Sequence, residues 1–438
     1  MIFIISLWSG EYLLNIGEKV NILSPSYINS IDVDNSGNVF ISFLSSYTSP
    51  YLEVYFAKLK KNGSIEYFRN VSRAGSIYSQ WAGFSSIIFS DSCIFLIWDD
   101  RRISYHDMNF QNEIFLRRYY QNISGGVWGG VENVTENDGN WSINPSCIIR
   151  NNKIYVVWKD TKNGLSEVFF RYLQNGIWSN IMTISESNVY AGSASIGFFG
   201  NNVFIAYEEA INGKIVIRCM DVNNMRKWII SDTLNNAFSP SSGFTYGKFG
   251  IVWNEIKNGR IRLIYREYDG EWKPPIIIRE SPNLSEPSLD ISDFKSFVWV
   301  ENGDIFYIDD NLSEPLKMNV NSYYCSNPLL KKDLNGNIFV FWNGYISGSP
   351  DKKIFYRIFD NGKEENYGYQ TLFVRDRIEI TGNFRSYAIL SIDGRKIKEE
   401  RLNGESVVFD FREIPCGLYF LLMEDNKEII RRKIVHIR

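Results

Sequence analysis

Five carboxylates recur at one place in a repeated pattern, two residues after a large aromatic. They are Asp100, Asp160, Glu209, Glu255 and Glu301. One interpretation is a ring of acid/base groups or a cation site. The other is that each acid caps the loop after a strand by accepting backbone N–H groups. A reaction at one bond needs one or two carboxylates in unlike environments, so that their pKa values differ. Five equivalent copies therefore predict a structural role, and we assign no catalytic residue.

A second group of residues could bind a sugar. Ten of the twelve tryptophans occupy recurring positions, whereas Trp81 and Trp141 do not. Between these two lies the segment "DDRRISYHDMNFQNE", which contributes Asp99, Arg101, Arg102, Tyr105 and His106. Exposed indoles beside arginines and acids can stack on a sugar ring and hydrogen-bond its hydroxyls or a carboxylate. The alternative is that each tryptophan only fills a gap between repeats.

The composition argues against a metal, a cofactor and a nucleic-acid partner. The chain has only two histidines and five widely separated cysteines with no CxxC pair, so we expect free, buried thiols and no metal site. A formal net charge of -3 gives no reason to expect a polyanion. No apolar run approaches the ~20 residues of a membrane helix. We expect a monomer that is not an integral membrane protein.

These residues must be positioned by a repeat of about 45–60 residues. The aromatics that end the strongest predicted strands are Phe43, Trp98, Trp158, Tyr207, Trp253, Trp299 and Trp342, spaced 55, 60, 49, 46, 46 and 43 residues apart. Each unit contains β-branched and aromatic strands, several begin after a proline, and Asn-Gly or Asp-Gly turns lead to the last strand. This period is typical of a four-stranded propeller blade. The sequence predicts an all-β fold, a β-propeller of seven blades over residues 1–367, with six blades as the alternative.

The two ends of the propeller region complement each other. The last repeat stops after its third strand, and "LWSGEYLLNI" near the beginning matches the fourth-strand text "IWSNIMTI". We predict that residues Leu7 to Asn15 pair with Ile354 to Phe359 and close the ring, which removes two open strand edges.

The repeats resemble those of sialidase-like propellers with BNR or Asp-box motifs. The segments "WDDRRISYHDMNFQNEIFLRRY" and "WKDTKNGLSEVFFRYL" are similar to the family unit W-x-D-x-[RK]-x-G followed by [DE]-[IV]-[YF]. The resemblance implies a sialidase that clamps a substrate carboxylate with three arginines, the first in an [FY]-R-I-P motif. That motif is absent here. The candidates Arg73, Arg101, Arg102, Arg260 and Arg279 are not grouped by spacing. Catalysis therefore has no support from the residues.

From about Gln370 the pattern changes to strands without tryptophan, which predicts a small β-sandwich over residues 370–438. This tail resembles the C-terminal sorting domain of the type IX secretion system. The matching residues are Asp393, Gly394, Arg395, Gly417, Tyr419 and Lys433. The usual Pro-Asn-Pro before the first strand is missing, and "MIFIISLWSG" is a weak signal peptide. The resemblance implies export through the type IX machinery.

The leading hypothesis is a secreted or cell-surface protein that binds carbohydrate or protein without catalysis. The partner would be a glycan or a surface protein. One alternative is a sialidase-like glycoside hydrolase, and a second is a structural surface or adhesion component. An isolated carboxylate with an arginine cluster would favour the enzyme, whereas a shallow aromatic platform would favour binding.

Overall fold

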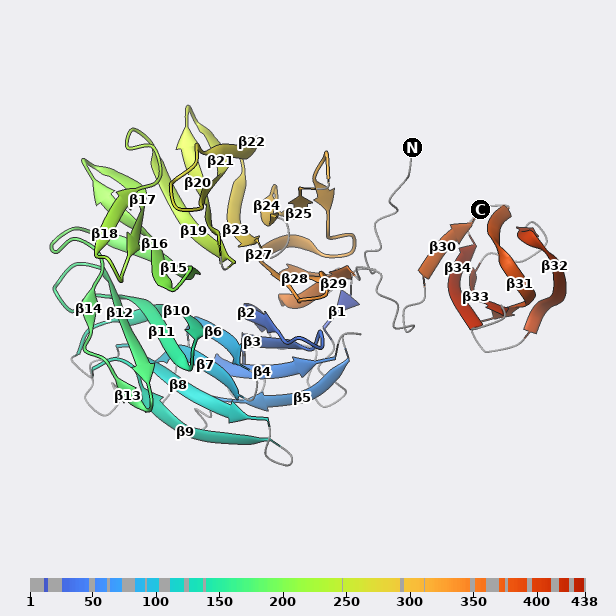
Figure 1. Ribbon diagram of the computed structural model, residues 1–438, viewed down its shortest axis with the longest axis horizontal. Helices are drawn as coiled ribbons and strands as arrows, with labels where there is room; N and C mark the ends of the chain where they lie inside the picture. Colours follow the sequence, from blue (N-terminus) through green and yellow to red (C-terminus); the bar gives the residue numbers. More distant parts are fainter. Residues whose placement is uncertain are drawn as a thin grey trace. The chain divides into compact units, whose positions relative to one another are not determined.

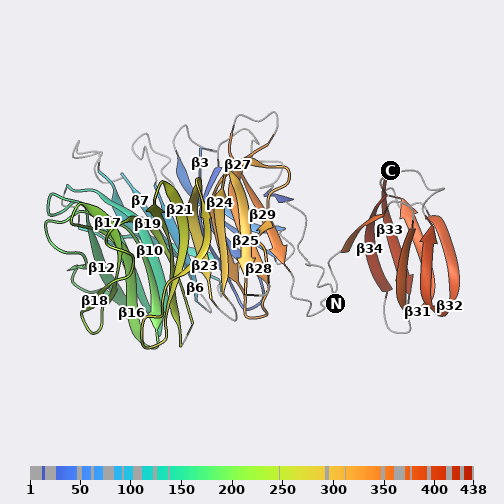
Figure 2. The same cartoon turned by 90° about the horizontal axis from the view of Figure 1, so that it is seen from above.

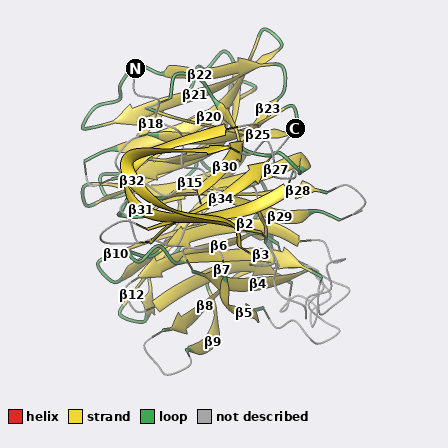
Figure 3. Ribbon diagram, turned by 90° about the vertical axis from the view of Figure 1, so that its right-hand side faces the viewer, coloured by secondary structure: helices red, strands yellow, loops and turns green. Residues whose placement is uncertain are grey.

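The computed structural model describes an all-β chain. The described residues are 12–14, 26–46, 52–60, 64–72, 83–90, 93–101, 111–121, 126–136, 139–245, 247–291, 295–310, 312–346, 351–359, 370–374, 377–391, 396–410, 417–424 and 429–436. Within these ranges there are strands, turns and loops but no helix (Figure 3). The chain divides into two compact units, Met1–Asn361 and Gly362–Arg438, close to the predicted division at residues 367–370.

The first unit is a β-propeller of seven antiparallel sheets arranged in a ring (Figure 1). Blades 1 to 3 are built from the following strands: β2 (Ser26–Val33), β3 (Val39–Ser45), β4 (Glu53–Leu59) and β5 (Ile65–Asn70); β6 (Ser85–Ser90), β7 (Cys93–Asp100), β8 (Glu113–Tyr120) and β9 (Val127–Asn133); β10 (Ser142–Arg150), β11 (Lys153–Asp160), β12 (Glu167–Gln174), β13 (Ile177–Trp178) and β14 (Met182–Thr183).

Blades 4 to 6 repeat the same order, and blade 7 ends with three consecutive strands. Their strands are β15 (Ala191–Phe199), β16 (Asn202–Ile211), β17 (Lys214–Asp221) and β18 (Arg226–Ile229); β19 (Asn236–Phe244), β20 (Phe249–Lys257), β21 (Arg260–Tyr268) and β22 (Ile276–Ser281); β23 (Leu284–Asp290), β24 (Ser296–Glu301), β25 (Asp304–Asp309) and β26 (Leu316–Lys317); β27 (Tyr323–Lys332), β28 (Ile338–Tyr345) and β29 (Lys353–Phe359).

The fourth strand of blade 7 comes from the N-terminal part of the chain. Strand β1 (Tyr12–Leu13) pairs antiparallel with β29 through Tyr12–Tyr356 and Leu13–Phe355. The Leu14 amide then donates to the Ile354 carbonyl at 2.9 Å, and the Leu14 side chain is buried in the core. The first and last blades are thereby joined. The rest of the segment predicted for this role, residues 7–11 and 15, lies outside the described residues.

The core lies between neighbouring blades. All seven anchor aromatics are buried, because successive strand side chains point to opposite faces and each face is covered by the next sheet. One cluster, for example, joins Phe95 and Ile97 of blade 2 to Ile154 and Trp158 of blade 3. Seen from above, the sheets stand side by side with their strands running between two faces (Figure 2). We call the face at which β11 ends and β10 begins the upper face.

A serine on the inner strand ties each of four blades to the next. The Oγ atoms of Ser30, Ser86, Ser195 and Ser288 accept backbone N–H groups from the following inner strand at 3.0–3.3 Å. Their donors are the amides of Ile87, Cys147, Ser242 and Leu330. Inner strands of adjacent blades lack backbone pairing, so a hydroxyl at this position satisfies amides that would otherwise be buried without a partner.

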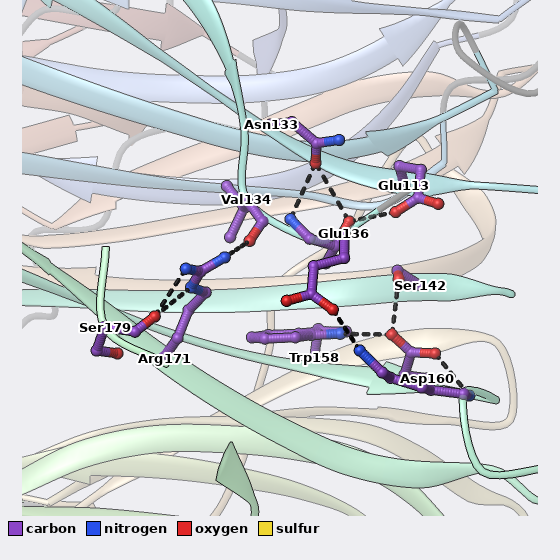
Figure 4. Close-up of polar contacts among 11 residues, drawn as sticks. Glu113, Asn133, Val134, Glu136, Ser142, Trp158, Asp160, Arg171 and Ser179 are labelled. Carbon is purple, nitrogen blue, oxygen red and sulfur yellow. Dashed lines mark hydrogen bonds and ion pairs between the residues drawn. The ribbon is translucent and has the colours of Figure 1, made fainter. Parts of the chain in front are cut away.

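An arginine on the third strand ties blades together farther from the centre. Arg117, Arg171 and Arg266 each donate to a carbonyl at the end of the preceding blade, those of Val71, Val134 and Ile230, at 2.6–2.9 Å. Figure 4 shows the contact of Arg171 with Val134 and its further contact with Ser179. Each guanidinium also lies 5.0–5.7 Å from the ring of a tryptophan near the blade's outer edge, Trp128, Trp178 or Trp272. These three recurring outer tryptophans thus pack against the arginines that join the blades.

The second unit contains one five-stranded sheet in the order β30-β34-β33-β31-β32. Its strands are β30 (Gln370–Val374), β31 (Arg377–Ser391), β32 (Lys396–Asp410), β33 (Gly417–Glu424) and β34 (Ile429–His436). Strand β30 is parallel to β34, and the other pairs are antiparallel. The sandwich stays a prediction. Of the predicted sorting residues, Gly417 and Tyr419 lie on β33 and Lys433 on its neighbour β34, whereas Asp393, Gly394 and Arg395 lie outside the described residues.

Candidate functional site

At the upper face, the two residues that follow the anchor aromatic lie at or near the end of each second strand. The first position is the residue directly after the anchor, and the second position is the next residue. Because side chains alternate along a strand, the second of these lies on the same side of the sheet as the anchor, and the first lies on the opposite side. The recurring acids occupy the second position, so their surroundings repeat along with the anchor.

The recurring acids accept the indole N–H of the anchor in three blades. Nε1 of Trp98, Trp158 and Trp299 lies 2.7, 2.9 and 3.4 Å from an oxygen of Asp100, Asp160 and Glu301, respectively. Asp160 also accepts the Ser142 hydroxyl at 2.7 Å and the Lys162 amide at 2.8 Å (Figure 4). A buried indole needs an acceptor, and the carboxylate supplies one. These contacts support the predicted structural role.

The remaining two acids are also buried but use other partners. Glu209 follows the tyrosine anchor Tyr207, forms an ion pair with Arg218 and accepts the Glu186 amide at 2.7 Å. Glu255 accepts the Asn235 side chain at 3.3 Å, and burial raises its pKa. The shared feature is therefore a buried acceptor at the end of the second strand.

In blade 7 a different residue accepts the indole N–H of the anchor. Its anchor Trp342 is followed two residues later by Gly344, and the indole N–H donates instead to the Ser322 hydroxyl at 3.0 Å. A Cβ at Gly344 would lie only 2.9 Å from the Ser322 Cβ. The glycine thus leaves the space that the serine needs.

The position directly after the anchor differs from blade to blade. Three of these residues accept a backbone amide from the inner strand of the next blade: Asp99 from Asn144 at 3.4 Å, Glu208 from Ser239 at 2.8 Å, and Asn343 from Ile28 at 2.9 Å. Each donor lies beside a register shift in its inner strand, where an amide is left out of the ladder. This position is where the ring loses its symmetry on the upper face.

Asp99 has the most perturbed carboxyl group at these positions. Its side chain is 1% exposed, and burial raises its pKa to about 7 although the Asn112 side chain and the Asn144 amide lower it. Asn112 Nδ2 donates to Oδ2 at 2.6 Å. On another side, Gly83 lies so close that a Cβ there would be 2.1 Å from Oδ2. Desolvation is the dominant cause of the shift.

A chain of contacts leads from this carboxyl to an exposed tryptophan. Asn112 Oδ1 accepts Nε of Arg101 at 2.9 Å, and the Arg101 guanidinium lies 5.1 Å from the centre of the Trp141 ring. Trp141 is 38% exposed, and its backbone N–H donates to the Thr161 hydroxyl at 3.0 Å. We call Asp99, Asn112, Arg101 and Trp141 the Asp99 chain. It combines an aromatic face, a cation and a polar interior within one interface between blades 2 and 3.

The structure brings together only part of the predicted site. Asp99, Arg101 and Trp141 meet through Asn112, which sequence reasoning missed. The sequence feature that could have drawn attention to Asn112 is that it directly precedes Glu113, the acid at which β8 begins. Trp81, Arg102, Tyr105 and His106 lie outside the described residues, so their part in the site stays a prediction.

Trp141 also proves to be a recurring position. Its carbonyl accepts the amide of Thr161, three residues after the anchor Trp158. In blade 4 the Tyr190 carbonyl likewise accepts the amide of Ala210, three residues after Tyr207, and in blade 7 Tyr323 pairs with Tyr345, three residues after Trp342. Tyr190 and Tyr323 are each 41% exposed, whereas asparagines hold this position in blades 5 and 6, Asn236 and Asn283. Trp141, Tyr190 and Tyr323 are thus exposed aromatic residues of the upper face.

A second cation accompanies the aromatic in the neighbouring blade. Lys159, which directly follows the anchor of blade 3, has its Nζ 5.6 Å from the Tyr190 ring. Among the described residues there is no group of three or more His, Cys, Asp or Glu suited to a metal. The part of the chain that the structure describes has no helix able to span a membrane. The four described cysteines are free and buried.

Fold and upper face together define a seven-bladed β-propeller with an asymmetric polar and aromatic surface. No protein-family model and no curated protein matches the sequence. Solved structures with similar folds include a mutant of Trypanosoma rangeli sialidase displaying trans-sialidase activity, at 12% identity and a TM-score of 0.44, which covers 69% of this chain and 56% of that one. The polysaccharide lyase Uly1 has 9% identity and a TM-score of 0.49, covering 76% and 90%. The α-L-arabinofuranosidase Arb93A from Fusarium graminearum has 8% identity and a TM-score of 0.48, covering 82% and 99%. These values carry no inference about activity.

Proposed function

We propose that this propeller is a secreted or cell-surface protein that binds carbohydrate on its upper face without cleaving it. The observation that carries the proposal is the Asp99 chain, in which Arg101 lies against the exposed ring of Trp141 and is itself held by Asn112. A planar aromatic face backed by a cation and amide groups suits the apolar face and the hydroxyls of a sugar.

The same contacts argue for binding over catalysis. Both oxygens of Asp99 accept hydrogen bonds, one from Asn112 and one from Asn144, and the side chain is almost wholly covered. A general acid must reach the proton acceptor within hydrogen-bonding distance. Here the exposed member of the chain is Trp141, so the surface offered to a ligand is a ring and not a carboxyl group.

The test is a binding measurement on Trp141→Ala. Screening the intact protein on a glycan array should identify a ligand, and calorimetry should then show weakening by roughly 1–3 kcal/mol, taking the magnitude of aromatic stacking on bases as a guide. Leu165→Ala is the matched control, because Leu165 is also an exposed apolar residue of blade 3 but carries no aromatic ring. Equal affinities of the tryptophan variant and the wild type would remove the proposal.

A glycoside hydrolase is the second candidate, and one observation favours it. An acid whose pKa is raised to about 7 by burial can stay protonated at neutral pH, as a general acid must. In that case Asp99→Asn would abolish hydrolysis of the glycan that the array identifies, while its binding remained. Absence of any hydrolysis by the wild-type protein, measured by release of reducing ends, would leave the binding function alone.

We also propose export by the type IX machinery, with residues 370–438 as the address. The support is the resemblance of this segment to sorting domains and its presence in a compact unit of its own. Residues of two matching stretches, Gly417–Tyr419 and Lys433, occupy the neighbouring strands β33 and β34. In a host that has this machinery, a fusion of a passenger protein to residues 362–438 should reach the cell exterior, and a passenger without them should not.

A further inference from the structure

A group of four tyrosines lies on the upper face where blade 7 meets blade 1. Tyr323 and Tyr324 begin β27, and Tyr345 ends β28. The ring centroids of Tyr323 lie 5.5 Å from Tyr324 and 6.1 Å from Tyr345. Burial raises the pKa of Tyr27 in blade 1, and the nearby Tyr345 and Asp351 raise it further. We call these four residues the tyrosine cluster.

The cluster is open to solvent and polar at its rim. Tyr323 is 41% and Tyr324 is 73% exposed. Lys352 Nζ lies 5.8 Å from the Tyr345 ring and donates to the Ser326 hydroxyl at 2.8 Å. The Tyr323 hydroxyl donates to the Ile346 carbonyl at 3.3 Å. The rim therefore places hydroxyl groups, an ammonium and the carboxylate of Asp351 near the exposed rings.

The backbone of Tyr324 is held in an unfavourable conformation. Its φ is 47°, a region that bulky non-glycine residues rarely adopt. Gly303 of blade 6 holds this segment in place, because its carbonyl accepts the Cys325 amide at 2.8 Å. Packing of the ring does not explain a tyrosine here, since most of the side chain is exposed. Glycine would suit this φ better. Beyond its edge contact with Tyr323, the ring is open to a ligand.

We infer that the tyrosine cluster is a second carbohydrate subsite, which takes a linear, uncharged polysaccharide. The Tyr324 ring is largely exposed and meets Tyr323 edge-on, so it offers a face on which a sugar can stack, and the stacked pair Tyr323 and Tyr345 lies beside it. Tyrosine hydroxyls, Lys352 and Asp351 supply both donors and acceptors for sugar hydroxyls. One cation and one carboxylate of the rim offset each other, which favours a neutral chain over an anionic one. This inference shares the ligand class of the proposed function but rests on a different blade and different contacts.

The sharpest variant is Tyr324→Gly in the full-length protein. It removes the ring and also relieves the positive φ, so the melting temperature should stay the same or rise. Affinity electrophoresis in gels containing mixed-linkage β-glucan, xylan or amylose should show retardation of the wild type by at least one of them. We expect at least a tenfold loss of affinity for that polysaccharide in Tyr324→Gly, and a smaller loss in Tyr324→Phe, which keeps the ring. Leu234→Ala, at a highly exposed apolar residue of blade 5, is the control and should behave as the wild type.

Including Trp141→Ala in the same gels separates the two sites. Loss of retardation with Tyr324→Gly alone supports the blade 7 subsite and removes the site at Trp141. Loss of retardation with Trp141→Ala alone supports the site at Trp141 and overturns the blade 7 subsite. Partial loss with each, and complete loss in the double variant, supports both. No retardation of the wild type by any of the three polysaccharides overturns the inference, as does self-association that Tyr324→Gly abolishes, which would identify the cluster as an interface between copies.

Discussion

At the scale of single residues, Asp99 makes the protein's stability depend on pH. The pKa of its carboxyl is raised from 3.8 to about 7, so the folded state retains this proton over a range in which the unfolded chain has lost it. The stabilising effect is complete below about pH 4 and is lost as the pH rises to about 7. For one group the linkage amounts to at most about 4 kcal/mol.

We predict that Asp99→Asn removes this dependence. The variant loses a hydrogen bond at every pH, because its one amide oxygen cannot accept from both Asn112 and Asn144, so its melting temperature shifts by a constant offset. The wild type should therefore lose stability relative to the variant between pH 4 and pH 7, and the difference should level off above. Thermal melts of both proteins across that range provide the measurement. Parallel curves would show that Asp99 does not titrate in this window.

A second prediction at this scale concerns the recurring acids. Asp160 is buried and accepts three donors, those of Trp158, Ser142 and Lys162, so Asp160→Ala should cost about 2–4 kcal/mol of unfolding free energy by leaving them without an acceptor. Ligand binding should not change. The control is Glu136→Ala, since Glu136 contacts the same Lys162 at the surface and its loss should cost under about 1 kcal/mol (Figure 4). Equal losses measured by chemical denaturation would contradict the structural role.

At the scale of strands, blade 7 shows that a hydroxyl from another strand can replace the recurring acid as the acceptor of the anchor's indole N–H. Trp342 obtains its acceptor from Ser322 across the sheet, in the space that Gly344 leaves. We predict that Gly344→Asp alone destabilises the protein, because the new side chain meets Ser322. Combined with Ser322→Gly, the aspartate should take over the indole N–H, as Asp100 does for Trp98.

The double variant should therefore lose less unfolding free energy than the sum of the losses in the two single variants. A double-mutant cycle measured by denaturant unfolding should give a coupling of about 1 kcal/mol or more, the range seen for residues in contact. Additive effects would mean that the two positions do not substitute for each other.

The same scale explains what the sequence could predict. The anchor aromatics and the hairpin turns depend on local pattern, so the seven-bladed propeller followed from spacing alone. The acids two residues after the anchor were also recognisable, because they share the side of the strand that carries the aromatic. The partners of Asp99 were not. Asn112 and Asn144 come from a neighbouring strand and from the next blade, and their contacts depend on strand register and on a bulge.

The recurrence of an aromatic residue at the position of Trp141 was missed for a related reason. Trp141, Tyr190 and Tyr323 lie opposite the same residue of the second strand but differ in residue type, and the number of bulges in their inner strands also differs. Only the pairing of the inner strand with the second strand shows that they are equivalent. The sequence therefore singled out two tryptophans, whereas the structure adds Tyr190 and Tyr323 at the position of Trp141.

At the scale of the whole molecule, the two compact units imply independent folding. Strand β1 completes blade 7 within the first unit, and Leu14 contributes to a core cluster shared by blades 7 and 1. The ring therefore needs the N-terminal segment, and its interactions are made inside Met1–Asn361. The sheet of the second unit likewise pairs its strands only with one another.

We accordingly predict opposite effects for removing the two ends. A chain ending at Asn361 should melt at the same temperature as the full-length protein, because no strand of the propeller loses its neighbour. A chain lacking residues 1–14 should melt lower and tend to self-associate, because β29 would become an open edge and the core around Tyr356 would lose Leu14. Calorimetry and light scattering on the three proteins give the comparison. If the C-terminal truncation lowered the propeller's melting temperature by several degrees, the tail would be part of the scaffold, and its proposed role as a separate address would no longer stand.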